Sequence, residues 1–356
     1  MEAWRGFRRE KLVENFYSSS CPNVESIVHH AVSTKLSQTF ATIPATLRLF
    51  FHDCFAEVFQ VQLPVIGVPK KHADYLCRGQ LMDENSCSKS WHNIFGYITA
   101  KFMLYHSNRR QSCIGCDTSI MIASLNGDAE RDAQDNLSLA GDGFDTDQGK
   151  TSSRSSMPRC RIITYPQNTN SKTSDPGGHA CPHCRRHIET LHRHSCPAGG
   201  PSFSVELGRR DRRISLASCV AGNLAKPFFD LTQLNAIFVK NNLTQFDMIA
   251  LSGAHTVGVS HCNNVENRLY SFSPSSPVDP YLDPNHAQQL MQACPQNIGP
   301  TIVINVDPVT PGTFDNVYYQ NLIARKGLFT SDQVLFTNPT SRPTVNDFAN
   351  NPNEFN

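Results

Sequence analysis

Residues 47–55 read Leu-Arg-Leu-Phe-Phe-His-Asp-Cys-Phe, and the interpretation of the whole chain starts from this stretch. On a helix, Arg48, Phe51 and His52 stand three and four residues apart, so they share one face. A cation, an aromatic wall and an imidazole on one face suit acid–base chemistry with stabilisation of developing charge. The same spacing also fits a histidine that is merely packed in an apolar core.

A second constellation occupies residues 250–258, which read Ala-Leu-Ser-Gly-Ala-His-Thr-Val-Gly. Thr244 and Asp247 have the spacing of a capping box ahead of it, and Gly258 is a helix stop signal. The pattern predicts one helix that carries His255 late on its apolar face. An imidazole there suits an axial ligand of a buried metal or haem, and the competing interpretation is a packed histidine at a helix end.

Helical periodicity dominates the other interpretable segments. Apolar side chains recur at helical spacing in residues 24–31, 230–238 and 314–322. Residues 230–238 open with capping-box spacing, and residues 283–294 open with proline at the first helical position. The sequence contains no alternation of strand and helix patterns and no repeat, so it predicts an all-α fold.

Composition excludes several classes of protein. Lys and Arg number 32 against 31 Asp and Glu, which gives a net charge of +1 over 356 residues. Such a balance favours neither nucleic acid nor an anionic membrane surface as a partner. No apolar run reaches the roughly 18 residues that a spanning helix needs. The 13 cysteines indicate secretion with several disulfides, although no apolar signal-peptide segment follows the N-terminal arginines.

Several short motifs follow one another along the chain. They are Phe16-Tyr17-x-x-x-Cys21-Pro22, the 47–55 stretch, Gly115-Cys116-Asp117-x-Ser119, Glu130-x-Asp132, Gly199-Gly200-Pro201, Leu207-Gly208-Arg209-Arg210-Asp211, the 250–258 stretch, Phe314-Asp315-Asn316 and Ser331-Asp332-Gln333. In this order they resemble the plant secretory (class III) haem peroxidase family, over about residues 12–56, 115–146 and 199–356.

The resemblance implies an all-α, two-lobed haem peroxidase domain over residues 12–356, with haem b between a distal and a proximal lobe. It implies an enzyme that reduces hydrogen peroxide and oxidises phenolic or other small organic donors. The same resemblance implies a secreted monomer.

The resemblance also assigns roles around the haem. His52 matches the distal base that takes a proton from peroxide and returns it to the leaving oxygen, and Arg48 matches the group that stabilises the developing charge. Phe51 matches the wall that restricts access to the reactive oxygen. Asn136, with Glu130 behind it, matches the network that orients His52.

On the proximal side, His255 matches the iron ligand and Asp332 matches the carboxylate that accepts its other N–H. Ala225 stands where the family has a proline at the donor entrance. Val306 stands where some members place an aromatic residue near the proximal histidine.

Two Ca²⁺ sites and two disulfides follow from the same matches. The distal set comprises Asp53, Ala56, Gly115, Asp117 and Ser119, with Glu130 beside it. The proximal set comprises Thr256, Asp307, Thr310, Thr313 and Asp315. The disulfides are Cys54–Cys116 and Cys262–Cys294, and Cys160 is the candidate partner of Cys21.

Two segments depart from the family pattern. Residues 57–114 interrupt the distal calcium loop, and residues 147–198 replace a helix that lines the haem cavity. Structureless loops of this length are uncommon, so the segments are interpreted either as surface insertions or as errors in a gene model. The chain also ends before the family's terminal helices, which makes a catalytically impaired relic the alternative function.

A zinc-binding module at Cys181 and Cys184 is the alternative of another class. Its histidines are poorly spaced for a Cys₂His₂ finger, because seven residues separate Cys184 from His192 and one separates His192 from His194.

Overall fold

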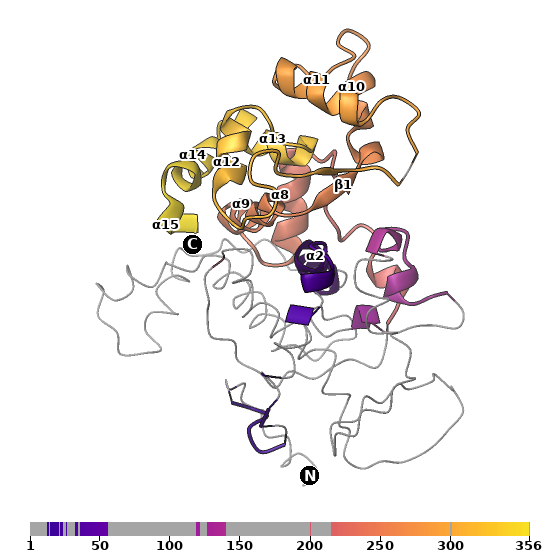
Figure 1. Cartoon of the computed structure of the whole chain (residues 1–356), viewed down its shortest axis with the longest axis vertical. Helices are drawn as coiled ribbons and strands as arrows, with labels where there is room; N and C mark the ends of the chain where they lie inside the picture. Colours follow the sequence, from indigo (N-terminus) through magenta and orange to yellow (C-terminus); the bar gives the residue numbers. More distant parts are fainter. Residues whose placement is uncertain are drawn as a thin grey trace, which may run out of the picture. The chain divides into compact units, whose positions relative to one another are not determined.

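The computed structural model describes parts of residues 13–35, then residues 36–55, 119–121, 127–139, 200, 215–299 and 301–355 (Figure 1). They belong to two compact units. The N-terminal unit holds the described residues up to 221 except residue 200, and the C-terminal unit holds residue 200 and the described residues from 222 to 355. The helix predicted over 24–31 falls almost entirely outside the described residues, as do the segments 57–114 and 147–198.

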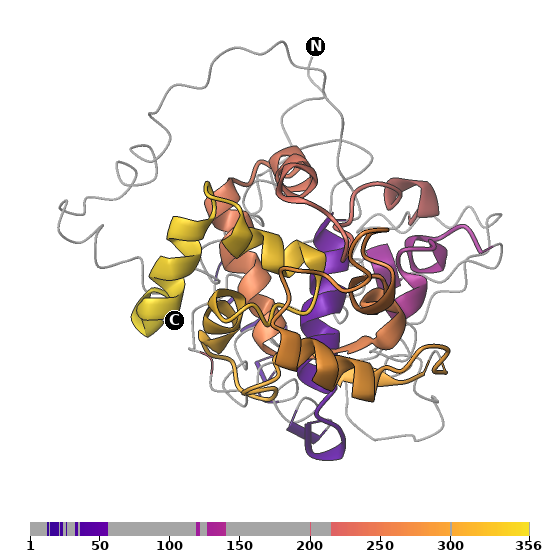
Figure 2. The same ribbon diagram turned by 90° about the horizontal axis from the view of Figure 1, so that it is seen from above.

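The described part of the N-terminal unit contains one long helix and several short 3₁₀ turns. Its elements are α2 (Thr42–Phe55), η1 (Ser119–Met121), η2 (Glu130–Asp132), η3 (Leu137–Leu139) and η5 (Ala217–Cys219). Figure 2 shows α2 as an unbroken helix, as the 47–55 stretch predicts. Leu49 of α2, Ile120 and Leu139 form a small buried apolar cluster. This packing fixes the short turns against the helix that carries Arg48 and His52.

The part of the C-terminal unit that the structure describes is a group of short helices with one small sheet. Its elements are α8 (Leu231–Lys240), α9 (Gln245–Ser252), η6 (Gly253–Thr256), β1 (Val259–His261), η7 (Cys262–Asn264), α10 (Glu266–Tyr270), α11 (Pro284–Ala293), β2 (Val303–Asn305), α12 (Val317–Ile323), α13 (Thr330–Thr337), α14 (Arg342–Asn350) and α15 (Pro352–Phe355). β1 and β2 pair antiparallel, with Ser260 opposite Ile304. The predicted helical fold is therefore confirmed. The two-stranded sheet was not predicted, because strands of three residues are too short to show an alternating sequence pattern.

Capping chemistry sets the starts of several helices where the sequence predicts them. The Asp230 carboxylate accepts the Gln233 amide at 2.8 Å, and the Gln233 side chain accepts the Asp230 amide at 2.9 Å. Thr244 and Asp247 form the equivalent box at the start of α9. At α11, Asp283 accepts the backbone N–H of His286 at 2.9 Å, with Pro284 at the first helical position.

The end of α9 differs from the prediction. The α-helix stops at Ser252, and His255 lies on the 3₁₀ turn η6 rather than on the α-helix itself. The N–H of Gly253 donates to the carbonyl of Ala250, three residues back, which is the 3₁₀ pattern. Glycine is a poor α-helix former, so the tightening of the chain at this point has a local cause.

A disulfide and an apolar cluster hold α10 and α11 together. Cys262 of η7 is bonded to Cys294 just after α11. The cluster around this bond comprises Cys262, Val265, Leu269, Leu282, Ala287, Leu290, Cys294, Val306 and Leu328. In a chain-entropy estimate, closing a loop of 32 residues stabilises the fold by about 3–4 kcal/mol.

A buried ion pair connects this region to the start of α13. The Arg268 side chain, 1% exposed, donates from Nε to Asp279 at 2.7 Å. Its Nη1 donates to the carbonyls of Gly327 and Leu328, at 2.5 and 2.8 Å. These two residues directly precede Phe329 and α13, so the hydrogen bonds from Arg268 fix the backbone just before that helix begins.

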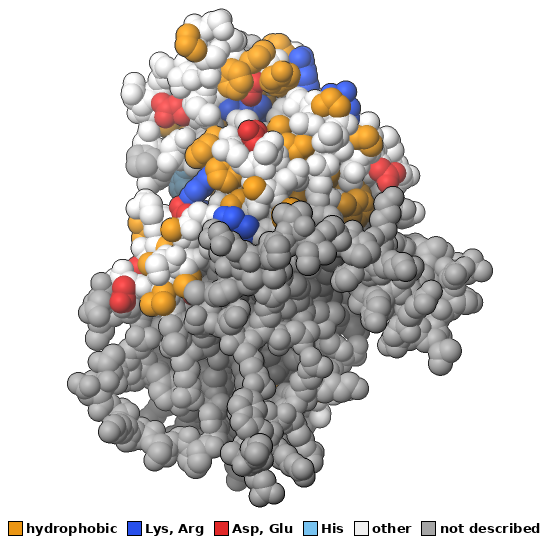
Figure 3. All heavy atoms as spheres, turned by 180° about the vertical axis from the view of Figure 1, so that it is seen from behind, with side chains coloured by type: hydrophobic (Ala, Val, Ile, Leu, Met, Phe, Trp, Pro, Cys, Tyr) orange, Lys and Arg blue, Asp and Glu red, His pale blue; other side chains and the backbone are white. Residues whose placement is uncertain are grey.

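The described surface carries no single dominant charge. Figure 3 shows acidic, basic and apolar side chains interspersed over one face of the described residues. Within the part of the chain that the structure describes, no helix has the length and apolar character needed to cross a bilayer.

Candidate functional site

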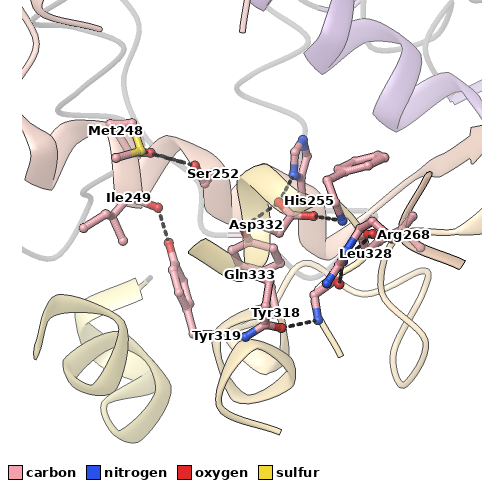
Figure 4. A network of polar contacts seen from close by, with 12 residues as sticks. Met248, Ile249, Ser252, His255, Arg268, Tyr318, Tyr319, Leu328, Asp332 and Gln333 are labelled. Carbon is pink, nitrogen blue, oxygen red and sulfur yellow. Dashed lines mark hydrogen bonds and ion pairs between the residues drawn. The ribbon is translucent and has the colours of Figure 1, made fainter. Parts of the chain in front are cut away.

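A histidine–carboxylate pair forms the centre of the site in the C-terminal unit (Figure 4). Nδ1 of His255 lies 2.7 Å from Oδ1 of Asp332. The Asp332 side chain is 2% exposed, whereas that of His255 is 42% exposed. With its Nδ1 proton directed at the carboxylate, the neutral ring carries its lone pair on Nε2, which is the form that binds a metal.

Asp332 is ionised despite its burial. Burial alone raises its pKa, but the adjacent His255, through its hydrogen bond and through its charge whenever the ring is protonated, outweighs that effect, and the pKa is below the ordinary 3.8. The Phe329 amide, 3.0 Å from Oδ2, and the Tyr318 hydroxyl, 2.9 Å from Oδ1, also stabilise the charged form. The carboxylate is therefore a charged acceptor held rigidly in the first turn of α13.

Two aromatic rings flank His255, and neither contact was predicted from the sequence. The ring centroid of Phe329 lies 5.5 Å from that of His255, and the centroid of Tyr318 lies 6.1 Å away, both edge-on. Val306, where some family members have an aromatic residue, is instead part of the buried cluster around the disulfide. Tyr318 belongs to a helical apolar stripe, which gave no sign that its hydroxyl bonds a carboxylate.

The N-terminal unit contains a second oriented histidine, His52 of α2. Its Nδ1 lies 2.7 Å from Oδ1 of Asn136, and Nδ2 of Asn136 donates to the main-chain carbonyl of Glu130 at 2.7 Å. Because the amide nitrogen is engaged by that carbonyl, the amide oxygen must face the histidine and accept its Nδ1 proton. The lone pair of His52 is thus on Nε2, where a base needs it.

Glu130 supports this arrangement through its main-chain carbonyl, which accepts the Asn136 side chain. Its carboxylate is fully buried and accepts the Ser119 hydroxyl at 2.8 and 2.9 Å. Its backbone N–H donates to the Ser215 hydroxyl at 2.9 Å. Glu130 therefore fixes Asn136 through its main chain and places a buried carboxyl group beside Ser119.

The remaining predicted residues of α2 lie beside His52. The Phe51 ring stacks on Phe55 with centroids 4.1 Å apart and lies 6.1 Å from the His52 ring. Arg48 is half-buried one turn before His52. The helix thus brings the guanidinium, the aromatic ring and the imidazole onto neighbouring positions of one element.

A cluster of oxygen atoms forms where η6 meets the 307–315 loop. The Thr256 hydroxyl lies 3.2 Å from both the carbonyl of Thr313 and Oδ1 of Asp315. The Thr310 hydroxyl lies 3.2 Å from Oδ1 of Asp315 and 3.3 Å from Oδ2 of Asp307. Hydroxyl, carbonyl and carboxylate oxygens together are the ligand types that Ca²⁺ prefers.

Asn321 of α12, which was not predicted from the sequence, supports this cluster. Its Nδ2 donates to Oδ1 of Asp307 at 2.9 Å. The same oxygen accepts the backbone N–H groups of Val309 and Thr310 at 2.7 and 3.0 Å. Asp307 is thereby fixed through Oδ1, while Oδ2 is directed toward Thr310.

The predicted distal calcium set is described only in part. Asp53 is buried and accepts the backbone N–H of Ile120 at 3.3 Å, and Ser119 bonds to Glu130. The other members of this set and several cysteines lie outside the described residues: Ala56, Gly115, Asp117, Cys21, Cys116, Cys160, Cys181 and Cys184. Cys54 is disulfide-bonded.

Ala225, predicted at the donor entrance, is half-buried in the loop before α8. The nearby Phe228 is 59% exposed, and its ring meets Phe229 edge-on with centroids 5.6 Å apart. Among the described residues, no group of three or more His, Cys, Asp or Glu side chains is arranged to hold a metal ion. The oxygen cluster accordingly relies on two carboxylates and neutral oxygens.

Comparison with known proteins places these features in a family. Residues 188–351 match a family model described as Peroxidase. Peroxidase 51 of Arabidopsis thaliana is 44% identical over 350 residues, which cover 96% of this chain and 82% of the relative. Peroxidase 50 and Peroxidase 55 of the same plant are 42% and 43% identical, over 97% of this chain and 83% and 81% of their own lengths.

Proposed function

The chain belongs to the plant haem peroxidase family, and on that premise we propose that His255 binds the iron of haem b while His52 acts on hydrogen peroxide. Membership makes it an enzyme that reduces hydrogen peroxide and oxidises phenolic or other small organic donors. The observation that carries the residue assignment is the buried, ionised Asp332 that holds the His255 ring with Nε2 free of its proton.

The residues around His255 fit a haem. A partly exposed imidazole backed by a buried carboxylate and flanked by aromatic rings is suitable chemistry for an axial ligand. Haem, when bound, supplies the redox-active iron at which peroxide is reduced. Asp332 increases the electron donation of His255 because it draws on the Nδ1 proton.

On the peroxide side, His52 acts as a base and then as an acid. Its Nε2 takes a proton from hydrogen peroxide and returns it to the departing oxygen. Asn136 keeps the ring in the required tautomer, since its Oδ1 accepts the Nδ1 proton. Arg48, which keeps its charge at all relevant pH values, stabilises the negative charge that develops on the departing oxygen.

The proposal includes the family's architecture and setting. In the family's arrangement, haem b would be held between a distal lobe that carries His52 and a proximal lobe that carries His255, with Phe51 restricting access and Ala225 beside the donor entrance. The enzyme is a secreted monomer that acts on small molecules rather than on nucleic acid or membranes. The 13 cysteines, the Cys262–Cys294 disulfide and the near-neutral charge support that setting.

Peroxide-dependent turnover tests this function. The purified chain is loaded with one equivalent of haem, and the oxidation of a simple phenol is followed with and without hydrogen peroxide. We expect oxidation that requires peroxide and greatly exceeds that of free haem at the same concentration. A rate equal to that of free haem would contradict the proposal.

Calcium completes the proposal, with two ions. The proximal ion is bound by Thr256, Asp307, Thr310, Thr313 and Asp315. The distal ion is bound by Asp53 and Ser119, with Glu130 beside it, together with Ala56, Gly115 and Asp117. Support for the proximal ion is the convergence of five residues' oxygens, and η6 connects that cluster directly to His255.

The replacement Asp307→Asn is expected to remove one of the two calcium ions. The amide keeps the shape of the side chain but loses the charge that Ca²⁺ requires. Calorimetric titration should give two ions per chain for the wild type and one for the variant. A saturated site stabilises the fold by about 2.7 kcal/mol when the ion is present at a hundred times its dissociation constant, so the calcium-induced rise in Tm should shrink.

The matched control for this variant is Asp347→Asn on the exposed face of α14. It removes the same charge without touching the oxygen cluster, and it should still bind two ions. Two ions bound by Asp307→Asn would refute the proximal site.

A further inference from the structure

We propose that Tyr318 is a positioning residue that sets the strength of the His255–Asp332 hydrogen bond and, through it, the reduction potential of the haem iron. The inference rests on the proposed role of His255 as iron ligand. It assigns a function to a hydroxyl group that the catalytic scheme does not otherwise use.

The geometry makes Tyr318 and His255 compete for one oxygen atom. Oδ1 of Asp332 accepts both Nδ1 of His255 at 2.7 Å and the Tyr318 hydroxyl at 2.9 Å. Oδ2 is engaged separately by the Phe329 amide at 3.0 Å. Because the carboxylate is buried, its charge is shared among these donors rather than with bulk water.

The phenol withdraws charge from the oxygen that accepts the imidazole proton. A donor on Oδ1 weakens the pull of Asp332 on that proton, so His255 stays closer to a neutral imidazole than to an imidazolate. A neutral imidazole donates fewer electrons to iron and stabilises the oxidised metal less. Tyr318 thus limits the electron donation that Asp332 promotes.

Tyr318 is a permanent and well-fixed donor. Burial, and next the charge of Asp332, raise its pKa well above 10, so the hydroxyl keeps its proton. Its side chain is 3% exposed and lies at the start of α12, which packs against both η6 and α13. The donor, the carboxylate and the histidine are therefore carried by elements in mutual contact (Figure 4).

The neighbouring Tyr319 provides a matched control. Its side chain is also fully buried, but its hydroxyl donates to the carbonyls of Ile249 and Ala250 at 2.9 and 3.3 Å. Tyr318→Phe and Tyr319→Phe each remove one buried hydroxyl and keep the ring. Only the first removes a donor from Asp332.

The test is the iron midpoint potential of the haem-loaded protein. In Tyr318→Phe, the loss of one hydrogen bond on Oδ1 should shift the equilibrium about fivefold toward the oxidised iron, which lowers the potential by about 40 mV at 59 mV per decade. Tyr319→Phe should leave the potential near that of the wild type. In an Asp332→Asn background, Tyr318→Phe should have little further effect, because the charged acceptor is gone.

An unchanged potential in Tyr318→Phe would overturn the inference, as would an equal shift in Tyr319→Phe or a shift that persists in Asp332→Asn. Failure of the underlying ligand assignment looks different. In that case His255→Ala would keep the haem spectrum of the wild type, whatever residue 318 does. Thermal unfolding of each variant verifies that the potential is measured on folded protein.

Discussion

Replacing His52 by alanine is expected to slow the reaction with hydrogen peroxide by roughly 10²–10⁴-fold, the usual contribution of a positioned acid–base group. Haem binding should persist, because His52 belongs to the peroxide side and the proposed iron ligand is His255. The measurement is the rate of the haem absorbance change after rapid mixing with peroxide, at several peroxide concentrations. The lost rate should appear in the second-order constant, since proton transfer and O–O cleavage share the same base.

Two further variants test whether the hydrogen bond between Asn136 and His52 contributes to this rate. Asn136→Ala removes the acceptor that fixes the His52 tautomer at 2.7 Å, so it should slow the reaction by less than His52→Ala does. Gln134→Ala, two residues earlier and exposed, should react like the wild type. Equal rates in wild type and His52→Ala would refute the role of the imidazole as base.

Replacing His255 by alanine is expected to abolish tight haem binding. The variant loses the imidazole nitrogen that is proposed to bind iron, and it leaves the buried charge of Asp332 without its main partner. Haem retention after gel filtration measures the effect, as the ratio of haem to protein absorbance. His261→Ala on the exposed face of β1 is the control and should retain haem.

Local chemistry explains which parts of the fold were predictable. The caps at Asp230, Thr244 and Asp283 each depend on side chains within three residues of the helix start, so spacing alone reveals them. The helix that carries Arg48 and His52 was also predictable, because its pattern lies within a few neighbouring residues. By contrast, β1 and β2 are paired across more than forty residues and are too short to show a period.

The site residues that belong to family motifs could be predicted from the sequence. Those that act through contacts between distant parts of the chain could not. His255 and Asp332 are 77 residues apart, and only the family resemblance predicted that the two side chains would pair. Tyr318 and Asn321 lie in an apolar helix pattern, where nothing local distinguishes a structural side chain from one that bonds a carboxylate. The backbone role of Glu130 was equally invisible, because a main-chain carbonyl leaves no trace in the sequence.

Resonance Raman spectroscopy of the reduced, haem-loaded protein tests the central claim most directly. The wild type, prepared with ¹⁵N-labelled histidine, should show an iron–nitrogen stretching band that shifts with the isotope, because Nε2 of His255 is bonded to iron. The same band should be absent from His255→Ala. An isotope-sensitive band that survives unchanged in His255→Ala would show that another histidine binds the iron and would contradict the account.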